Sequence, residues 1–411
     1  MAMSRDISTG MLSLEEALSR ITGHLTPLPS ETVTLPRAIG RYTASTVTAQ
    51  VDLPSFDNSA MDGYAVRASD VTSASLASPV MLKKVGRIAA GQANCPALLS
   101  GQCIRLFTGS PLPAGADAVV MQEDTEILET LPDVVSVKDS VKPWENVRFR
   151  GEDIRNGATL LRQGDLVSAG VAGLLSATGI GTVDVHRRPK VSLIASGSEL
   201  RDPGQTLPPG CIYESNRAAL AGALSRLGIE AQQRPLMPDT LEATLSELKS
   251  AMETSDIVIT TGGVSVGELD FLKPAFEGIG GKQEFWKIAI KPGKPFVFGR
   301  WNNTLWFGLP GNPVSAFVTF QLLVRPALLK QMGARSTSHP ISWGHLVESL
   351  ANRGDRRHFI RVQVDDQGRV RSSGTQASHF LGSLANANGM VDVGPGKTIE
   401  AGELVPVLRF D

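Results

Sequence analysis

Apolar residues follow two different spacings along the 411-residue chain, and each spacing predicts a different kind of structure. Short segments in which apolar and polar residues alternate predict β-strands, and they dominate residues 67–150 and the chain after Gly333. Residues 187–330 instead alternate unbroken apolar runs, such as 257–260, with segments of helical periodicity. Strands that are buried on both faces of a parallel sheet have such unbroken runs. This region therefore predicts an α/β fold with a doubly wound, mostly parallel sheet.

Signals for the ends of elements refine the α/β region. Asp239 has the position of an N-cap for a helix over residues 240–254. Asn312, which is followed by a proline, has the position of an N-cap for a helix over residues 313–330. The apolar segment 285–290 predicts a further strand of the same unit.

These patterns divide the chain into four units. The β-rich segment lies between two flanking segments that we expect to fold together, so one unit is discontinuous. The expected units are residues 1–51 with 151–186, residues 52–150, residues 187–330 and residues 331–411.

Composition and charge exclude several classes of protein. Lys plus Arg number 40 against 41 for Asp plus Glu, a net charge of -1, which argues against a nucleic-acid or membrane-surface binder. No apolar run approaches the roughly 20 residues of a membrane span, and residues 1–10 lack the apolar core of a signal peptide. The three cysteines form no C-x-x-C motif, and the six histidines have no zinc-site spacing. We therefore expect a cytoplasmic protein with reduced thiols and no zinc chemistry.

Glycines, hydroxyls and charged residues cluster where the strands of the α/β region are expected to end. Ligands of open α/β sheets bind at the carboxyl ends of the strands, where glycine allows close approach of the backbone. Carboxylates there suit Mg²⁺, whereas lysines and a helix start suit anions. The same residues can instead form ordinary turns, a helix cap at Asp239 and solvated lysines. The clusters are Ser196–Glu199, Thr261–Asp270, Lys287–Pro295 and Gly308–Ser315.

The β-rich segment adds a second group of polar residues. Asp57 and Asp62 precede a short strand, Thr108 begins a loop rich in proline and glycine, and residues 148–153 hold two cations and two acids. Solvated turns explain these residues equally well. Neither a Walker A motif nor a G-x-G-x-x-G motif follows a strand, which disfavours nucleotide hydrolysis and hydride transfer.

Five segments resemble motifs of the molybdopterin molybdenumtransferase family, which includes MoeA and the E domain of gephyrin. They are residues 57–65, 150–153, 261–267, 289–295 and 308–315, and they occur in the family order over nearly the whole chain. The resemblance implies insertion of molybdate into adenylylated molybdopterin with Mg²⁺-dependent release of AMP. It also implies a homodimer whose cleft is lined by both chains. The implied fold is a multidomain α/β subunit with a three-layer αβα molybdopterin-binding domain, a β-rich inserted domain, an elongated linking domain and a C-terminal β-barrel-like domain.

The resemblance also assigns roles to individual residues. The implied catalytic residues are Asp62, Glu199, Asp239, Asp270, Lys287 and Lys291, with Asp239 and Asp270 as ligands of Mg²⁺. The implied substrate-binding residues are Thr108, Arg148, Asp153, Ser196, Gly262, Gly263, Ser265, Lys294, Pro295, Pro310, Pro313, Ser315, Arg361 and Ser378. The chain departs from the family where Ser198 replaces the usual Asp and where Glu214 replaces a frequent Asp.

Two other functions remain open from the sequence. The adenylyltransferase that makes the adenylylated pterin has a domain similar to residues 187–330, but it requires ATP and has no need of the other units. A scaffold could use the same fold to present a partner surface. The expected partners are adenylylated molybdopterin, molybdate, a second copy of the chain and possible contact with that adenylyltransferase, without nucleic acid or membrane.

Overall fold

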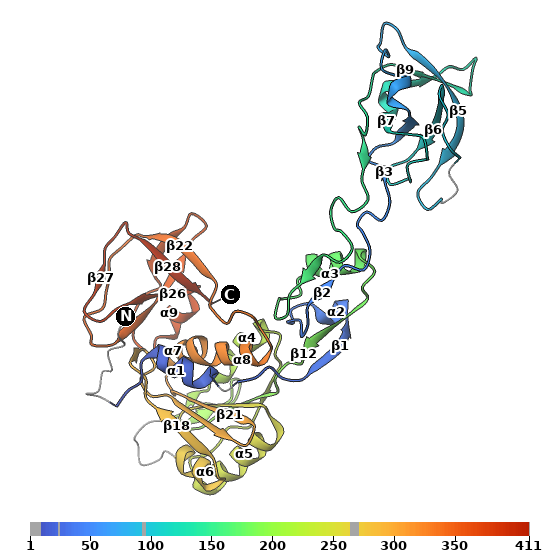
Figure 1. The fold of residues 1–411 in the computed structure, drawn as a ribbon. Coiled ribbons are helices and arrows are strands. Elements are labelled where there is room, and N and C mark those ends of the chain that lie inside the picture. The colour runs from blue at the N-terminus through green and yellow to red at the C-terminus, as the bar shows by residue number, and fades with distance from the viewer. Residues whose placement is uncertain (1–9, 24, 93–95, 264–270, 411) are drawn as a thin grey trace.

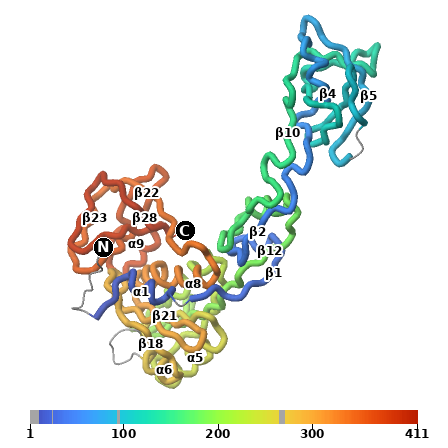
Figure 2. The backbone as a smooth tube through the Cα atoms, viewed as in Figure 1, coloured from blue at the N-terminus to red at the C-terminus, as the bar shows by residue number. Residues whose placement is uncertain are grey.

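The computed structural model describes residues 10–23, 25–92, 96–263 and 271–410. The molecule is elongated: the β-rich segment lies at one end, and the α/β region and the C-terminal strands lie together at the other (Figures 1 and 2). A narrow region made from two separate segments connects the two ends. Within the described residues, no helix is both long and apolar enough to cross a membrane.

The narrow region is held together by strands far apart in sequence. β1 (Ser30–Thr34) pairs antiparallel with β12 (Thr182–His186), and β2 (Val47–Thr48) pairs antiparallel with β11 (Thr159–Leu161). The helices of this region are α2 (Leu35–Ala38) and α3 (Ala169–Ala177). Their apolar residues share one small core with the strands, so the segments before and after the β-rich insertion pack on each other.

The β-rich segment forms a six-stranded sheet in the order β7-β4-β6-β5-β9-β8. Its strands are β4 (Gly63–Val66), β5 (Val80–Ile88), β6 (Gln102–Leu106), β7 (Ala118–Met121), β8 (Thr125–Ile127) and β9 (Val134–Val137). A separate antiparallel pair, β3 (Asn58–Ser59) with β10 (Val147–Arg148), lies where the chain enters and leaves this sheet.

The α/β region contains a six-stranded sheet in the order β16-β13-β17-β21-β20-β18. Its strands are β13 (Val191–Ala195), β16 (Ala231–Gln233), β17 (Ile257–Thr261), β18 (Lys282–Trp286), β20 (Val297–Trp301) and β21 (Thr304–Leu309). The pairings from β16 to β21 are parallel, and the last two are antiparallel. The expected mostly parallel sheet is therefore confirmed.

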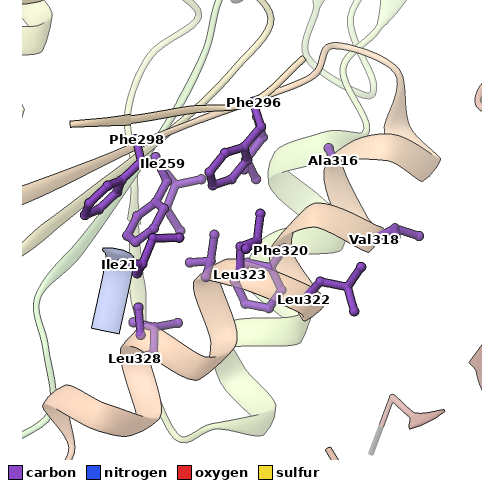
Figure 3. Packing of buried hydrophobic residues seen from close by; sticks show 14 of the residues in the cluster. Ile21, Ile259, Phe296, Phe298, Ala316, Val318, Phe320, Leu322, Leu323 and Leu328 are labelled. Atoms are coloured by element: carbon purple, nitrogen blue, oxygen red, sulfur yellow. The ribbon is translucent and has the colours of Figure 1, made fainter. Parts of the chain in front are cut away.

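Helices cover both faces of this sheet because successive strand residues point to opposite sides. Ile257 and Ile259 pack toward one set of helices, as Figure 3 shows for Ile259, whereas Val258 packs toward the other. On the first face lie α4 (Asn216–Arg226), α7 (Pro313–Thr319), a π-helical turn η3 (Phe320–Val324) and α8 (Arg325–Gln331). On the second face lie α5 (Leu241–Thr254) and α6 (Leu272–Gly278). The result is the expected three-layer αβα arrangement.

The C-terminal strands close into a barrel. β24 (Arg357–Val364), β25 (Arg369–Ser372), β22 (Ile341–Leu346), β28 (Leu404–Arg409) and β26 (Gly389–Val393) follow one another, and β26 pairs back with β24. Two further strands, β23 (Leu350–Ala351) and β27 (Thr398–Ile399), pair with each other, and α9 (Leu381–Ala385) precedes β26. The predicted C-terminal β-barrel is confirmed. Near the N-terminus, α1 (Leu14–Thr22) packs on α8, and its Glu15 forms an ion pair with Arg357 of the barrel.

Two local predictions were wrong. The N-cap of α5 is Thr240, whose hydroxyl accepts a hydrogen bond from the Ala243 N–H, so Asp239 lies outside the helix. The expected strand 285–290 is divided because Lys287 has a left-handed backbone with φ of 79°. Its second part, β19 (Ile290–Lys291), pairs with β24 of the barrel instead. The expected helix 313–330 is present as the consecutive helical segments α7, η3 and α8, with π-helical spacing at η3 just before Pro326, whose nitrogen has no hydrogen to donate.

Candidate active site

The main cavity of the α/β region lies where the parallel strands β13, β17 and β21 end side by side. It has a volume of about 770 Å³. A cavity of this size suits a substrate larger than a single sugar or amino acid. Eight residues that the sequence pointed to line it, namely Ser196, Glu199, Asp239, Gly262, Gly263, Pro295, Pro310 and Pro313.

Asp239 is held against the loop that follows β13. The Ser196 hydroxyl donates a hydrogen bond of 3.0 Å to one carboxylate oxygen of Asp239, and the Ser198 N–H donates one of 2.9 Å to the other. In return, the Asp239 N–H donates to the Ser198 hydroxyl at 3.2 Å. Each carboxylate oxygen can accept more than one bond, so Asp239 is oriented by its neighbours and still able to bind a cation. Ser198 therefore orients the Asp239 carboxylate through its backbone N–H, which any residue except proline would supply at this position, and its hydroxyl accepts the Asp239 N–H.

Two glycines provide the space that this arrangement needs. Gly262 has φ of 81°, and a Cβ atom there would lie 2.5 Å from the Ser196 carbonyl oxygen. No side chain fits between the ends of β13 and β17 at this point. A Cβ atom at Gly197 would lie 2.8 Å from both carboxylate oxygens of Glu199, so that carboxylate occupies the space left by the missing side chain.

The structure adds cavity residues that were not among the predicted ones. Asn216, at the start of α4, donates a hydrogen bond of 2.8 Å to the Gly311 carbonyl, and its own side-chain oxygen is buried without a partner. Glu214 also lines the cavity, but its carboxylate accepts hydrogen bonds from the N–H and the Nε of Arg217. The run Glu214–Asn216 is the sequence signal that could have identified them, because the resemblance already pointed to Glu214 as a position where the family frequently has Asp.

The predicted lysines do not form the described wall of the cavity. Lys291 and Lys294 are exposed on the segment that leads into Pro295, which lines the cavity. Lys287 places Nζ 4.0 Å from the ring centroid of Trp286, which is cation–π geometry. Ser315 is buried in α7. Asp270 and Ser265, which the sequence also singled out, lie outside the described residues.

The barrel contributes one edge of the cavity through the loop that precedes α9. His379 and Leu381 line the cavity, and neither was predicted. The Asn312 side chain donates a hydrogen bond of 3.1 Å to the Ser378 hydroxyl, so this predicted residue lies directly beside the cavity. Arg361 lies beneath the loop and is fully buried. Burial lowers the pKa of its guanidinium to about 10.

The predicted residues of the β-rich segment form a separate group. Asp62 accepts hydrogen bonds from the N–H and hydroxyl of Thr108, and Arg148 of β10 pairs with Asn58 of β3. The Asp153 N–H donates to the Leu53 carbonyl. The strands β3 and β10, and with them Asp62, Thr108 and Arg148, lie at the opposite end of the molecule from the cavity (Figures 1 and 2). A single chain therefore does not bring the two groups together.

A complete metal site is not assembled by one chain in the part that the structure describes: no group of three His, Cys, Asp or Glu side chains there could hold an ion. Asp239 and Glu199 nevertheless line the same cavity. Mg²⁺ commonly binds one or two carboxylates and takes its remaining ligands from water and substrate phosphates. The two carboxylates are thus compatible with Mg²⁺, and the described wall adds one histidine, His379, and no cysteine, which is short of a zinc site.

Together, the fold and the cavity define an α/β protein that binds its ligand at the carboxyl ends of parallel strands, with a barrel at the rim. Three family models match the chain in order: "MoeA N-terminal region (domain I and II)" at residues 12–179, "Probable molybdopterin binding domain" at 192–330 and "MoeA C-terminal region (domain IV)" at 344–410. The chain belongs to the molybdopterin molybdenumtransferase family.

Individual relatives cover nearly the whole chain. A molybdopterin molybdenumtransferase of Haemophilus influenzae is 36% identical over 98% of this chain and 99% of its own length. Molybdopterin molybdenumtransferase 2 of Mycobacterium tuberculosis is 40% identical over 88% of this chain and 90% of its own. A solved structure of the molybdopterin biosynthesis protein MoeA from Pyrococcus horikoshii OT3 is 30% identical, with a TM-score of 0.82 over 97% of this chain and 99% of that chain.

Proposed function

We propose that this chain inserts molybdate into adenylylated molybdopterin, releasing AMP and forming molybdenum cofactor. The observation that carries the proposal is the location of the cavity. Apart from two barrel residues, every residue that lines it falls within residues 192–330, the part that matches the molybdopterin-binding model. Its volume of about 770 Å³ accommodates a phosphorylated pterin.

Mg²⁺ is part of the proposal, and Asp239 and Asp270 would hold it. Bound there, the ion would neutralise charge on the substrate phosphates and polarise the phosphoanhydride. Ser196 and Ser198 keep the Asp239 carboxylate in one orientation through their hydrogen bonds. Such supporting bonds raise the metal affinity of a ligand because less ordering is needed on binding.

The exposed lysines have a distinct part in the proposed reaction. Molybdate is a dianion that must approach a phosphorylated substrate, and two unit charges ~4 Å apart repel by about 4 kcal/mol at an effective dielectric constant near 20. Lys294 directly precedes Pro295 of the cavity wall, Lys291 lies earlier on the same segment, and both are exposed and able to offset that repulsion. They attract molybdate and hold it near the phosphate that leaves with AMP.

A homodimer would bring the second group of residues to the cavity. Asp62, Thr108 and Arg148 lie with β4 and β10 at the far end of the subunit, and Asp153 lies beside Leu53 on the segments that lead there, so these residues reach a cavity if they belong to the other subunit. The elongated shape supports this arrangement, because an arm of that length can extend across a neighbouring molecule. We also propose that residues 1–51 with 151–186, 52–150, 187–330 and 331–411 are the four domains. A cytoplasmic location and contact with the adenylyltransferase of the same pathway complete the proposal.

One assay separates this function from its rivals. Purified protein is incubated with adenylylated molybdopterin, Mg²⁺ and molybdate in the absence of ATP, and AMP is quantified by chromatography. The proposal requires AMP release that depends on molybdate. A second incubation with ATP and molybdopterin, without molybdate, tests the adenylyltransferase, which would consume both compounds. A scaffold would release no AMP in either incubation.

A further inference from the structure

Arg361 and the loop before α9 form an unusual arrangement. Arg361 is fully buried, and among the described residues no carboxylate forms an ion pair with it. Leaving a buried cation without a counter-charge is costly, so its hydrogen bonds must have a structural or functional purpose. Its side-chain hydrogen bonds go to Thr375 and Ala377 of the loop and to Ser383 of α9, and its Nη1 is buried without a partner among the described residues.

The guanidinium fixes this loop at both ends. Nη2 donates to the carbonyl oxygens of Thr375 and Ala377 at 2.8 and 3.3 Å and to the Ser383 hydroxyl at 2.9 Å. Nε donates to the same hydroxyl at 3.2 Å. The backbone of Arg361 adds bonds to the Gln376 side chain. Residues on either side of 378–382 are therefore tied to one planar group, which restricts how the loop can move.

The middle of the loop is docked on the start of α7. The Val314 N–H donates to the Ser378 carbonyl at 3.2 Å, and the Asn312 side chain donates to the Ser378 hydroxyl at 3.1 Å. Asn312 itself lines the cavity. The next residue, His379, is exposed and faces the same cavity from the barrel side.

His379 has a chemical character that the rest of the described wall lacks. The charged side chains of that wall are the acids Glu199, Glu214 and Asp239, and no lysine or arginine is among them. An imidazole is thus the single group of the described wall that can donate a hydrogen bond as a cation. His379 can therefore donate an N–H hydrogen bond from the barrel side to a phosphate in the cavity.

We propose that His379 is a further substrate-binding residue, which contacts an anionic phosphate of the bound pterin, and that Arg361 is a positioning residue that acts through the loop carrying His379. This inference rests on the proposed function for the identity of the substrate. It differs from the role implied by the family resemblance, in which Arg361 itself contacts molybdate.

The test compares His379→Ala, Arg361→Lys and the double variant, with calorimetric binding of molybdopterin as the first readout. Loss of one charged hydrogen bond predicts roughly tenfold weaker binding for each single variant. Because both changes remove the same contact, the double variant should be no weaker than Arg361→Lys alone. His379→Gln retains an N–H donor and should recover part of the affinity. His345→Gln, an exposed histidine elsewhere on the barrel, is the matched control and should bind as the wild type does.

A second measurement separates positioning from direct contact. Ser383→Ala keeps the Arg361 guanidinium but removes the hydroxyl that accepts two of its bonds, so it should weaken molybdopterin binding and speed proteolysis between residues 374 and 383. In the AMP-release assay, positioning predicts a raised KM for the pterin substrate with an unchanged KM for molybdate. Additive losses in the double variant, or a raised KM for molybdate alone, would overturn the proposal. Failure of the wild type to release AMP would reject the proposed reaction, whereas the binding data would still decide the role of His379.

Discussion

The carboxylate of Asp62 accepts two hydrogen bonds from Thr108, one of 2.7 Å from its N–H and one of 2.8 Å from its hydroxyl. These bonds, from the N–H first and then the hydroxyl, hold the pKa of Asp62 below its ordinary value. A depressed carboxylate pKa contributes stability above the ordinary pKa of Asp, and this contribution is lost as pH falls through the folded-state pKa. Asp62 is thus ionised throughout the neutral range and ready to face a substrate cation or N–H group.

Thr108→Val should raise the pKa of Asp62 part of the way toward its ordinary value, because one of the two bonds is removed and the N–H bond remains. The measurement is a titration of the Asp62 carboxyl carbon by NMR below about pH 5. Thr108→Ser retains a hydroxyl and should titrate as the wild type does. An unchanged pKa in Thr108→Val would mean that the hydroxyl bond is absent in solution.

Ser196→Ala should weaken the response to Mg²⁺ and leave the fold intact. It removes the hydrogen bond that orients one oxygen of Asp239, and loss of such a supporting bond typically lowers metal affinity about 10- to 100-fold. The measurement is the Mg²⁺ concentration that gives half-maximal AMP release. Asp239→Asn should abolish the Mg²⁺ dependence, whereas Asp365→Asn, at a barrel hairpin, should leave it unchanged. Equal Mg²⁺ dependence in Ser196→Ala and the wild type would contradict the role given to this pair.

Gly262→Ala should destabilise the protein and reduce activity. Its left-handed backbone disfavours any side chain by roughly 1–2 kcal/mol, and the new Cβ atom would also lie 2.5 Å from the Ser196 carbonyl oxygen. Gly280→Ala is a matched control, since Gly280 has φ of 85° and nothing within 4 Å of a Cβ position. Urea unfolding should show a larger loss for Gly262→Ala than for Gly280→Ala. A loss of the same size in both variants would show that the loop after β13 moves away without cost.

Trp144→Gly should stabilise the protein relative to Trp144→Ala. Trp144 has φ of 69°, a backbone conformation that costs a non-glycine residue roughly 1–2 kcal/mol, and its side chain is 48% exposed. Both variants lose the ring contact with Phe149, so their difference isolates the backbone strain. Thermal unfolding followed by circular dichroism provides the comparison. A lower melting temperature for Trp144→Gly than for Trp144→Ala would contradict the prediction. It would mean that residue 144 does not hold the left-handed backbone conformation in solution.

The sequence predicted the strands and helices of the α/β region correctly because each element is specified by residues that are neighbours in the chain. The apolar run at 257–260 became β17, buried on both faces, and the helical periodicity before it became α5. Alternating segments near the C-terminus became the barrel strands. Spacing of apolar residues reports burial, and burial within one strand or helix is decided over a few residues.

Local predictions from the sequence were wrong where a residue has two possible partners or conformations. Asp239 has the sequence position of a helix cap, but Ser196 and Ser198 of a distant loop bind its carboxylate, and Thr240 caps α5 instead. Lys287 lies in an apolar run, but its left-handed backbone ends β18 and allows β19 to join the barrel. The sequence contains both possibilities, and only the packing of the surrounding segments selects one.

The sequence by itself determined the kind of fold and most of the polar groups that could form a site, since its strand periodicity, glycines and family motifs are local properties. Only the tertiary structure decided which of those groups meet. It placed Ser196, Asp239 and Gly262 around one cavity, brought His379 to that cavity from the barrel, and put Asp62 with Thr108 at the far end of the subunit. The physical reason is that contacts between distant segments depend on the packing of whole units, and no short stretch of residues contains that information.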